Sequence, residues 1–290
     1  MSQPEKQNQH RVPQVYLKQW GYKAADKRWY IFTIDKESKQ VKEFRVDGFS
    51  TAVNVFDYLS DDPQEKRHYE ITAGVVEKKY HTVVRSIQYQ KMLNTLHEDL
   101  LRHFIASLIC RSEVFRDFFT EMLADDRRVD NILGEITTFE NEMPSMLGLT
   151  LKIAEPDERM SLVQGIVTNY ISKALRRFKS AILRDFNDLN WFTSDNPVHM
   201  DLQNDYESII SPDSEIYLPL SPNLCLFLFC EASEKNANPL RRLAPNRIHD
   251  IDYETFQIIN HRLIHNGVKE LIIPLKHKDS FMEAAAEQAS

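Results

Sequence analysis

Apolar side chains recur at alternating steps of three and four residues through the middle of the chain, and this spacing constrains the fold most. The first stripe of this kind consists of Ala73, Val76, Tyr80, Val83 and Ile87. Such spacing gives a long helix one apolar face. A second helix is predicted from about His97 to Met122, and a third from about Asp157 to Leu189. The middle of the chain is therefore predicted to be a helical block.

Extended segments flank this block on both sides. A β-hairpin is predicted at residues 29–46, where KESK separates the aromatic and β-branched runs WYIFTID and QVKEFRV. Near the other end, IYLPLSP and NLCLFLF predict an apolar strand pair, or one strand broken at Pro219 and Pro222. Asp252 can N-cap a helix that runs through His265 and stops at Gly267. VKELIIPL then predicts a final strand.

Strands at both ends and helices between them predict an α+β fold in a single domain. We expect this domain to span residues 10–275. It divides into a β-rich part at 10–62, a helical part at 63–190 and a mixed part at 191–275. Residues 1–9 are predicted to be a disordered lead, and residues 276–290 a frayed tail.

Charge and composition exclude some classes of function. A net charge of -7 over 290 residues argues against a general nucleic-acid coat, which gains its affinity by neutralising phosphates. A localised nucleotide or nucleic-acid site, or a protein partner, remains compatible with this charge. We expect no membrane partner, because no apolar run is long enough to cross a bilayer and the N-terminus lacks the apolar core of a signal peptide. Together with three cysteines that form no metal-ligand spacing, these features favour a cytoplasmic protein.

The stretch WFTSDNPVHM, residues 191–200, is the candidate for a functional turn. Pro197 excludes the helical basin for Asn196, so Asp195 and Asn196 leave a strand end on a stiff, extended turn. Short polar groups held rigidly beside buried aromatic side chains are one way in which a scaffold presents a site.

Arg111 breaks the apolar stripe of the second helix, which is otherwise formed by Leu101, Phe104, Leu108, Phe115, Phe118 and Met122. A guanidinium at such a position must be paired or must extend to the edge of the helical block. Glu77 borders the apolar face of the first long helix and is the candidate partner. The pair would either join two helices or reach the Asp195 turn.

Two further polar residues lie at positions that the local sequence pattern does not explain. Asn260 lies on the apolar face of the last helix, and its amide could bind the backbone of the Asp195 turn. His10 could serve as a general acid, a general base or a metal ligand, or simply lie on the surface. His261, His265 and His277 do not form a structural zinc spacing with a cysteine or glutamate.

The order of these motifs resembles an uncharacterised, mainly bacterial family, domain of unknown function 4238. That family opens with a motif similar to His10, Pro13, Tyr16, Leu17 and Trp20, with Phe at the last position. Its later motifs are similar to Glu77, to Arg111 with a polar residue after it, to Ser194–Val198, to Pro219–Pro222 and to Asn260. Family members often have Thr-Pro after the arginine, where this chain has Ser112 and Glu113. The resemblance covers residues 10–275 and implies one domain, but no reaction.

Three hypotheses follow. In the first, the chain is a hydrolase of a phosphodiester or nucleotide, with His10 as general acid or base. Asp195 and Glu77 would then hold a divalent cation such as Mg²⁺ or orient the base, and Arg111 would stabilise an anionic group. In this hypothesis the substrate is positioned by Tyr16, Asn196 and Asn260.

In the second hypothesis, the chain is a binding or sensing module without chemistry, for example a subunit of a bacterial defence or toxin-type system. The same polar residues would then form a structural network, and function would lie on the outer surface. The third hypothesis, general nucleic-acid binding, needs a basic face on an acidic protein, and the sequence offers only scattered basic pairs. Geometry distinguishes the first two, since a catalytic set would line an open cleft.

Overall fold

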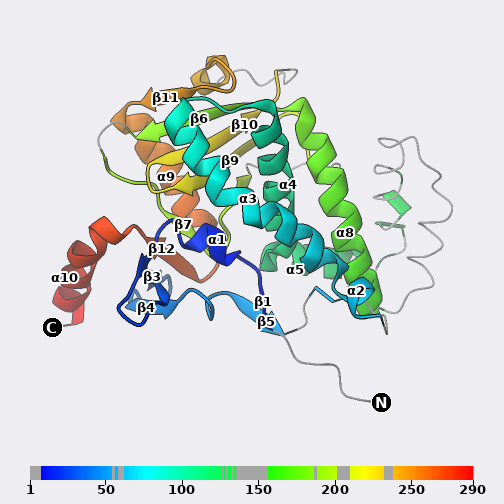
Figure 1. Ribbon diagram of the computed structural model, residues 1–290, viewed down its shortest axis with the longest axis horizontal. Coiled ribbons are helices and arrows are strands. Elements are labelled where there is room, and N and C mark those ends of the chain that lie inside the picture. Colours follow the sequence, from blue (N-terminus) through cyan, green and yellow to red (C-terminus); the bar gives the residue numbers. More distant parts are fainter. Residues whose placement is uncertain are drawn as a thin grey trace.

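The computed structural model has the α+β architecture predicted from the sequence (Figure 1). It describes residues 8–53, 56–57, 62–123, 156–185, 188–200, 210–231 and 238–289, and a few residues between 125 and 134. The predicted disordered lead therefore lies outside the described residues up to residue 7. The same holds for residues 135–155 of the predicted helical part.

Helices make up most of the middle of the chain. The α-helices are α1 Gln14–Leu17, α2 Pro63–Lys66, α3 His68–Gln90, α4 Thr95–Arg111, α5 Glu113–Leu123, α8 Pro156–Ala174, α9 Tyr253–Asn266 and α10 Lys278–Ala289. Short 3₁₀ turns lie at Leu175–Arg177, Pro239–Arg242 and Leu275–His277. The long helix α3 confirms the prediction from the first apolar stripe, since Ala73, Tyr80, Val83 and Ile87 are all buried.

Among the described residues, the strands form two larger sheets and one short pair. The first sheet has the order β11-β6-β10-β9-β8, with β6 Lys179–Asp185, β8 His199–Met200, β9 Glu215–Ser221, β10 Leu224–Phe229 and β11 Ile248–Ile251. The second has the order β2-β3-β12-β7 with β4 beside β3, from β2 Tyr22–Lys23, β3 Trp29–Asp35, β4 Val41–Arg45, β7 Thr193–Ser194 and β12 Glu270–Ile273. β1 Asn8–His10 pairs with β5 Thr51–Val53.

The first sheet is buried on both faces. In β10, Leu224, Leu226 and Leu228 join the core shared with the helical block, whereas Cys225, Phe227 and Phe229 pack in the cluster that includes α9. A strand covered on both faces reads as a continuous apolar run, which explains the sequence LCLFLF. The sheet thus lies between the helical block and α9.

The third predicted helix is only partly correct. Helix α8 ends at Ala174, and the chain then enters β6, which is the strand paired antiparallel with β10. Phe178 and Ile182 are four residues apart, a step that fits one face of a helix and also one face of a strand. Because this step is compatible with both periods, the apolar spacing could not separate them.

The second predicted helix is broken at Ser112, which has extended backbone angles. Its hydroxyl donates to the carbonyl of Ile109 at 2.8 Å and accepts from the amide of Phe115 at 3.1 Å. Ser112 therefore ends α4 and caps α5. The break changes which side of α5 is buried, so Phe119 is 2% exposed while Phe118 is 38% exposed.

Both predicted boundaries of the domain need correction. Asn8 and Gln9 belong to β1 rather than to a disordered lead, because they pair with Val53 and Ala52. The predicted frayed tail contains helix α10 from Lys278. Its sequence MEAAAEQA has a high intrinsic helix propensity, and the ring of Phe281 lies edge-on against Phe192 at 5.7 Å.

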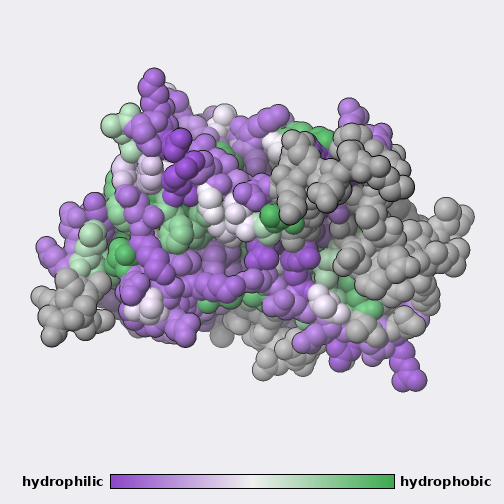
Figure 2. Space-filling model, turned by 90° about the horizontal axis from the view of Figure 1, so that it is seen from below, coloured by the Kyte–Doolittle hydropathy of each residue, from purple (hydrophilic) through white to green (hydrophobic). Residues whose placement is uncertain are grey.

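The outer surface is largely polar where it is seen in Figure 2, with apolar side chains in small separate groups among the described residues. Within the part of the chain that the structure describes, no helix is both long and apolar enough to span a bilayer.

An aromatic group joins α3, α4 and the N-terminal segment and gives a test of the core. Phe104 is 2% exposed, stacks on Tyr80 with ring centroids 4.5 Å apart, and lies 6.1 Å from the ring of Tyr16. We expect Phe104→Ala to lower the free energy of unfolding by about 3–5 kcal/mol, because it removes a buried ring and leaves a cavity. Urea unfolding followed by circular dichroism would measure this.

Phe118→Ala is the matched control, because Phe118 is partly exposed on the neighbouring helix. It should cost about 1 kcal/mol or less. Equal losses in the two variants would contradict the packing described here.

Candidate functional site

The predicted polar residues fall into two groups in the structure. The Arg111 group contains Arg111, Glu70, Glu77 and the backbone of His10. The turn group contains Asp195, Asn196 and the end of α9 with the start of β12. Within the described part of the chain, no hydrogen bond joins one group to the other.

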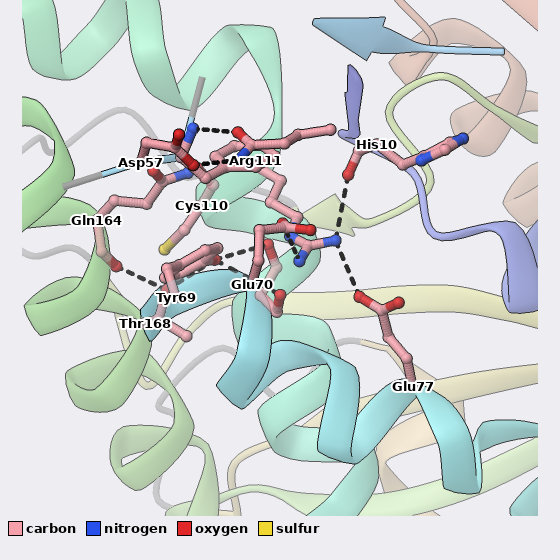
Figure 3. A network of polar contacts seen from close by, with 12 residues as sticks. His10, Asp57, Tyr69, Glu70, Glu77, Cys110, Arg111, Gln164 and Thr168 are labelled. Carbon is pink, nitrogen blue, oxygen red and sulfur yellow. Dashed lines mark hydrogen bonds and ion pairs between the residues drawn. The ribbon is translucent and has the colours of Figure 1, made fainter. Parts of the chain in front are cut away.

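Arg111 is the last residue of α4, and its guanidinium reaches from there to α3 (Figure 3). Nη1 donates to Glu77 Oε1 at 2.9 Å and to the carbonyl oxygen of His10 at 3.1 Å. Nη2 donates to Glu70 Oε1 at 2.7 Å. The Arg111–Glu77 pair between two helices is therefore present, as the sequence suggested, and a second carboxylate joins it.

Burial is uneven across this group. The Arg111 side chain is 2% exposed, whereas those of Glu70 and Glu77 are 29% and 25% exposed. The guanidinium also lies over the rings of Phe56 and Tyr69, at 5.1 and 5.5 Å from their centroids. The carboxylates thus border solvent, while the charge that holds them is enclosed by aromatic rings.

Charge and burial act against each other on the pKa values of this group. Burial lowers the pKa of Arg111, but the carboxylates of Glu77 and Glu70 outweigh it, so the pKa is raised and the group stays charged. Burial raises the pKa of Glu70, although the charge of Arg111 opposes the shift. Arg111 is therefore a permanent cation whose partners keep it inside the fold.

His10 contributes its backbone, not its imidazole, to Arg111. Figure 3 shows the ring pointing away from the guanidinium. Its Nε2 lies 3.1 Å from the carbonyl oxygen of Asp47 and 3.3 Å from Gln14 Nε2. Burial lowers the pKa of His10, and the backbone contact with Asp47 and the charge of Glu77 only partly offset this. The imidazole is therefore neutral at neutral pH.

The segment that carries His10 is fixed on both sides. Gln9 is 4% exposed, donates through its amide to Asp57 Oδ1 and accepts from the backbone of Phe56 at 2.7 Å. The backbone of Arg11 donates to the carbonyl oxygen of Ser50 at 2.9 Å. These contacts fix the backbone on both sides of His10, and so they position its carbonyl oxygen to accept from Arg111.

The Asp195 carboxylate binds backbone, not a charged side chain. Oδ1 accepts from the amide of Val268 at 2.8 Å, and Oδ2 accepts from the amides of Lys269 at 2.8 Å and Glu270 at 3.3 Å. The amide of Asp195 in turn donates to the carbonyl oxygen of Glu270 at 3.1 Å. Asp195 thus supplies hydrogen-bond acceptors for three backbone amides between α9 and β12. Without it, these amides would have to bind water.

Asn196 makes the second half of the same contact. Its Nδ2 donates to the carbonyl oxygen of Asn266 at 3.1 Å. Asn266 returns two hydrogen bonds, from its own Nδ2 to the carbonyl oxygens of Asn196 at 2.6 Å and Val198 at 2.8 Å. The turn therefore binds the last residue of α9. We call the hydrogen bonds of Asp195 and Asn196 with residues 266–270 the Asp195 lock.

Gly267 allows the two sides of the lock to approach. Its φ of -60° is open to any residue, so its backbone does not require glycine. A Cβ at this position, however, would lie 2.8 Å from Ser194 Cβ and 3.2 Å from Ser194 Oγ. Such a distance is too short for two carbon atoms, so glycine is needed here for space.

Asn260 and Tyr16 fix the strand that leads into this turn. Asn260 is 8% exposed, and its Oδ1 accepts from the amide of Phe192 at 3.0 Å. The Tyr16 hydroxyl lies 2.6 Å from Thr193 Oγ1, and burial raises its pKa well above the ordinary value. Asn260 thus binds the backbone beside the turn, close to the contact that the sequence suggested.

One chain of ion pairs links the two groups. Glu113 accepts from Arg11 Nη1 at 2.9 Å and from Lys269 Nζ at 3.1 Å. Arg11 follows His10, and the backbone of Lys269 binds Asp195. Glu113 therefore ties the N-terminal segment to the Asp195 lock through the start of α5.

The contacts of Asp195 and Glu77 give little support to the prediction that these residues hold a divalent cation. Glu77 binds Arg111, and the Asp195 carboxylate accepts hydrogen bonds from three backbone amides. Among the described residues, no group of three or more His, Cys, Asp or Glu side chains is arranged to hold a metal ion.

The sequence reasoning missed Glu70, Glu113 and the lock residues Asn266 and Gly267. Glu70 had a usable signal, since it lies seven residues before Glu77 and so on the same face of α3. Ser112 followed by Glu113 is also a helix start signal. Asn266 and Gly267 lie some 70 residues from their partners, a separation over which periodicity carries no information.

Comparison of the chain with models of known protein families identifies its family. The family described as "protein of unknown function (DUF4238)" matches residues 8–276. The chain belongs to this family. The match covers the described parts of both groups and all three sheets, in agreement with the resemblance noted in the sequence. No curated protein matches the chain, and no solved structure does.

The Asp195 lock gives a second prediction. We expect Gly267→Ala to lower the free energy of unfolding by about 1–3 kcal/mol, because the new methyl group overlaps Ser194. Thermal and urea unfolding of the purified variant would measure this loss.

Gly74→Ala is the matched control, because a Cβ there meets nothing within 4 Å on helix α3. It should raise the free energy of unfolding by about 0.5–1 kcal/mol. If both changes stabilise the protein, the close approach at Gly267 is wrong.

Proposed function

We propose that the chain is a binding or sensing module without chemistry, in which the predicted polar residues hold the fold together and recognition takes place on the outer surface. The observation that carries this is the placement of Arg111. Its side chain is 2% exposed, and its guanidinium donates hydrogen bonds to Glu70, Glu77 and the backbone of His10. A guanidinium in this position cannot reach a bound phosphate without leaving two carboxylates unpaired.

The other predicted site residues support the same proposal. Each makes side-chain hydrogen bonds within the fold, as given above for His10, Tyr16, Glu77, Asp195, Asn196 and Asn260. Polar side chains that bind one another within a fold help to make it specific and rigid. In this network Arg111 Nε is the one guanidinium nitrogen without a hydrogen-bond partner among the described residues. The three cysteines are free and buried, which fits a reducing, cytoplasmic setting.

One observation favours a second candidate, a hydrolase of a phosphodiester or nucleotide. The His10 imidazole points away from Arg111 and is half-buried, and burial lowers its pKa. A neutral imidazole can accept a proton, which is the role of a general base. Glu70 and Glu77 are bound to the same guanidinium and border solvent, so they would contribute acceptors to a substrate site.

Hydrolysis assays separate the two candidates. Wild-type protein and His10→Ala would be incubated with bis-p-nitrophenyl phosphate and with nucleoside triphosphates, each with Mg²⁺ or Mn²⁺. The module predicts no turnover above the buffer rate in either protein, together with no nucleotide binding by calorimetry. Turnover that is lost in His10→Ala, with an unchanged melting temperature, would overturn the module in favour of the hydrolase.

If the protein turns over a substrate through His10, the direction in which the rate changes with pH can be predicted. A base acts only when it is deprotonated, and burial lowers the pKa of His10 from its ordinary 6.5. Turnover through His10 should therefore rise with pH at values below 6.5 and be constant at pH 7 and above. A rise that is centred above pH 7 would exclude His10 as the base.

A further inference from the structure

Two imidazoles lie side by side on the exposed face of α9, and neither side chain takes part in the two polar groups described above. His261 and His265 are four residues apart, a spacing that stacks side chains on one face of a helix. Both are exposed, their Nε2 atoms are 2.9 Å apart, and their ring centroids are 4.1 Å apart. The two Nε2 atoms, which commonly bind metals in proteins, therefore lie close together on one face of the helix.

The separation of these nitrogens fits two ligands of one metal ion. Imidazole nitrogens bind such ions at about 2.0–2.1 Å, so two of them at a right angle lie about 2.9 Å apart. At a tetrahedral angle the separation would be about 3.3 Å. The distance of 2.9 Å between the two nitrogens is therefore within the range that allows both to bind one ion.

We propose that His261 and His265 form a surface site for a divalent first-row transition metal, with Cu²⁺ preferred over Ni²⁺ and Zn²⁺. This site does not depend on the function proposed above. Imidazole suits these metals, and their affinities for nitrogen sites rise to Cu²⁺ and fall again at Zn²⁺. Mg²⁺ and Ca²⁺ require oxygen ligands and should not bind. The remaining coordination positions face solvent, so water or a partner's side chain would complete them.

Each imidazole can supply a lone pair without a net change of protonation. The contact between the two rings needs one Nε2–H donor, and a neutral histidine can carry its proton on Nδ1 instead. Metal binding would require that tautomer in both rings and the loss of the hydrogen bond between them. Rotation of the two rings would then direct both lone pairs at one ion, since α9 holds the two residues one turn apart.

The surroundings of the pair have opposing charges. The C-terminal end of α9 favours a cation, because its last carbonyl groups carry partial negative charge. Lys36 counters this, since its Nζ donates to the carbonyl oxygens of His265 at 3.2 Å and Gly267 at 2.5 Å. The coordinate bonds, not the helix end, would therefore provide the affinity. A bound ion would stiffen the turn that carries Asn266, and with it one side of the Asp195 lock.

Calorimetric titration of tag-free, full-length protein with CuCl₂, NiCl₂, ZnCl₂ and MgCl₂ tests the site. We expect one Cu²⁺ per chain, weaker binding of Ni²⁺ and Zn²⁺, and none of Mg²⁺. His261→Ala and His265→Ala should each weaken Cu²⁺ binding by about 100-fold, because a second ligand on the same helix acts at high effective concentration. Electron paramagnetic resonance of the Cu²⁺ complex should show two nitrogen ligands in wild type and fewer in either variant.

His81→Ala is the control for general binding by surface histidines, since His81 is exposed on α3. It should bind Cu²⁺ as the wild type does. Both histidine variants of α9 should keep the wild-type melting temperature without metal, because the positions are exposed and alanine favours helix. Added Cu²⁺ should raise the melting temperature of the wild type and of His81→Ala, but not that of either α9 variant. The site is refuted if either α9 variant binds as tightly as wild type, or if His81→Ala loses as much.

Discussion

The buried guanidinium of Arg111 is the interaction on which the arrangement of the chain depends. It joins the end of α4 to two carboxylates of α3 and to the backbone of the N-terminal segment. Removing one partner of a buried charge costs several kcal/mol, because the remaining charge stays without compensation. Three parts of the chain that are far apart in sequence are therefore held at one point.

The Asp195 lock depends on that point indirectly. Arg111 fixes the His10 backbone, the following residue Arg11 binds Glu113, and Glu113 binds Lys269. Tyr16, on the same N-terminal segment, contacts Thr193 directly before the turn. The segment from His10 to Trp20 thus lies between the two polar groups and connects them. Polar side chains in such an arrangement can keep separate elements in register without taking part in a reaction.

Much of the fold could be predicted because its signals are local. The hairpin of β3 and β4, the pair of β9 and β10, helix α3 and the cap of α9 by Asp252 follow from periodicity and turn residues, and the structure contains all of them. Where two periods share a step, as at Phe178 and Ile182, the choice depends on strand pairing that periodicity cannot reveal. The break at Ser112 had a local signal, but the apolar stripe continues past it.

Some contacts of the candidate site could be predicted from the sequence, but the partners of the Asp195 turn could not. A charge in an apolar stripe must find a partner, and this argument correctly joined Arg111 to Glu77. It also placed Asn260 beside the backbone of the Asp195 turn. The same argument could not tell which turn meets which helix, because the partners of Asp195 are backbone amides some 73 to 75 residues away. Backbone amides leave no trace in the sequence.

Hydrogen exchange of backbone amides, compared between wild type and Arg111→Met, tests the role of Arg111 most directly. Methionine keeps much of the side-chain volume but removes the charge. The account predicts that residues 10–20 lose protection in the variant, while β9 and β10 keep theirs, because the N-terminal segment is held by Arg111 and the sheet is not. Unchanged protection of residues 10–20, with the variant folded, would contradict it.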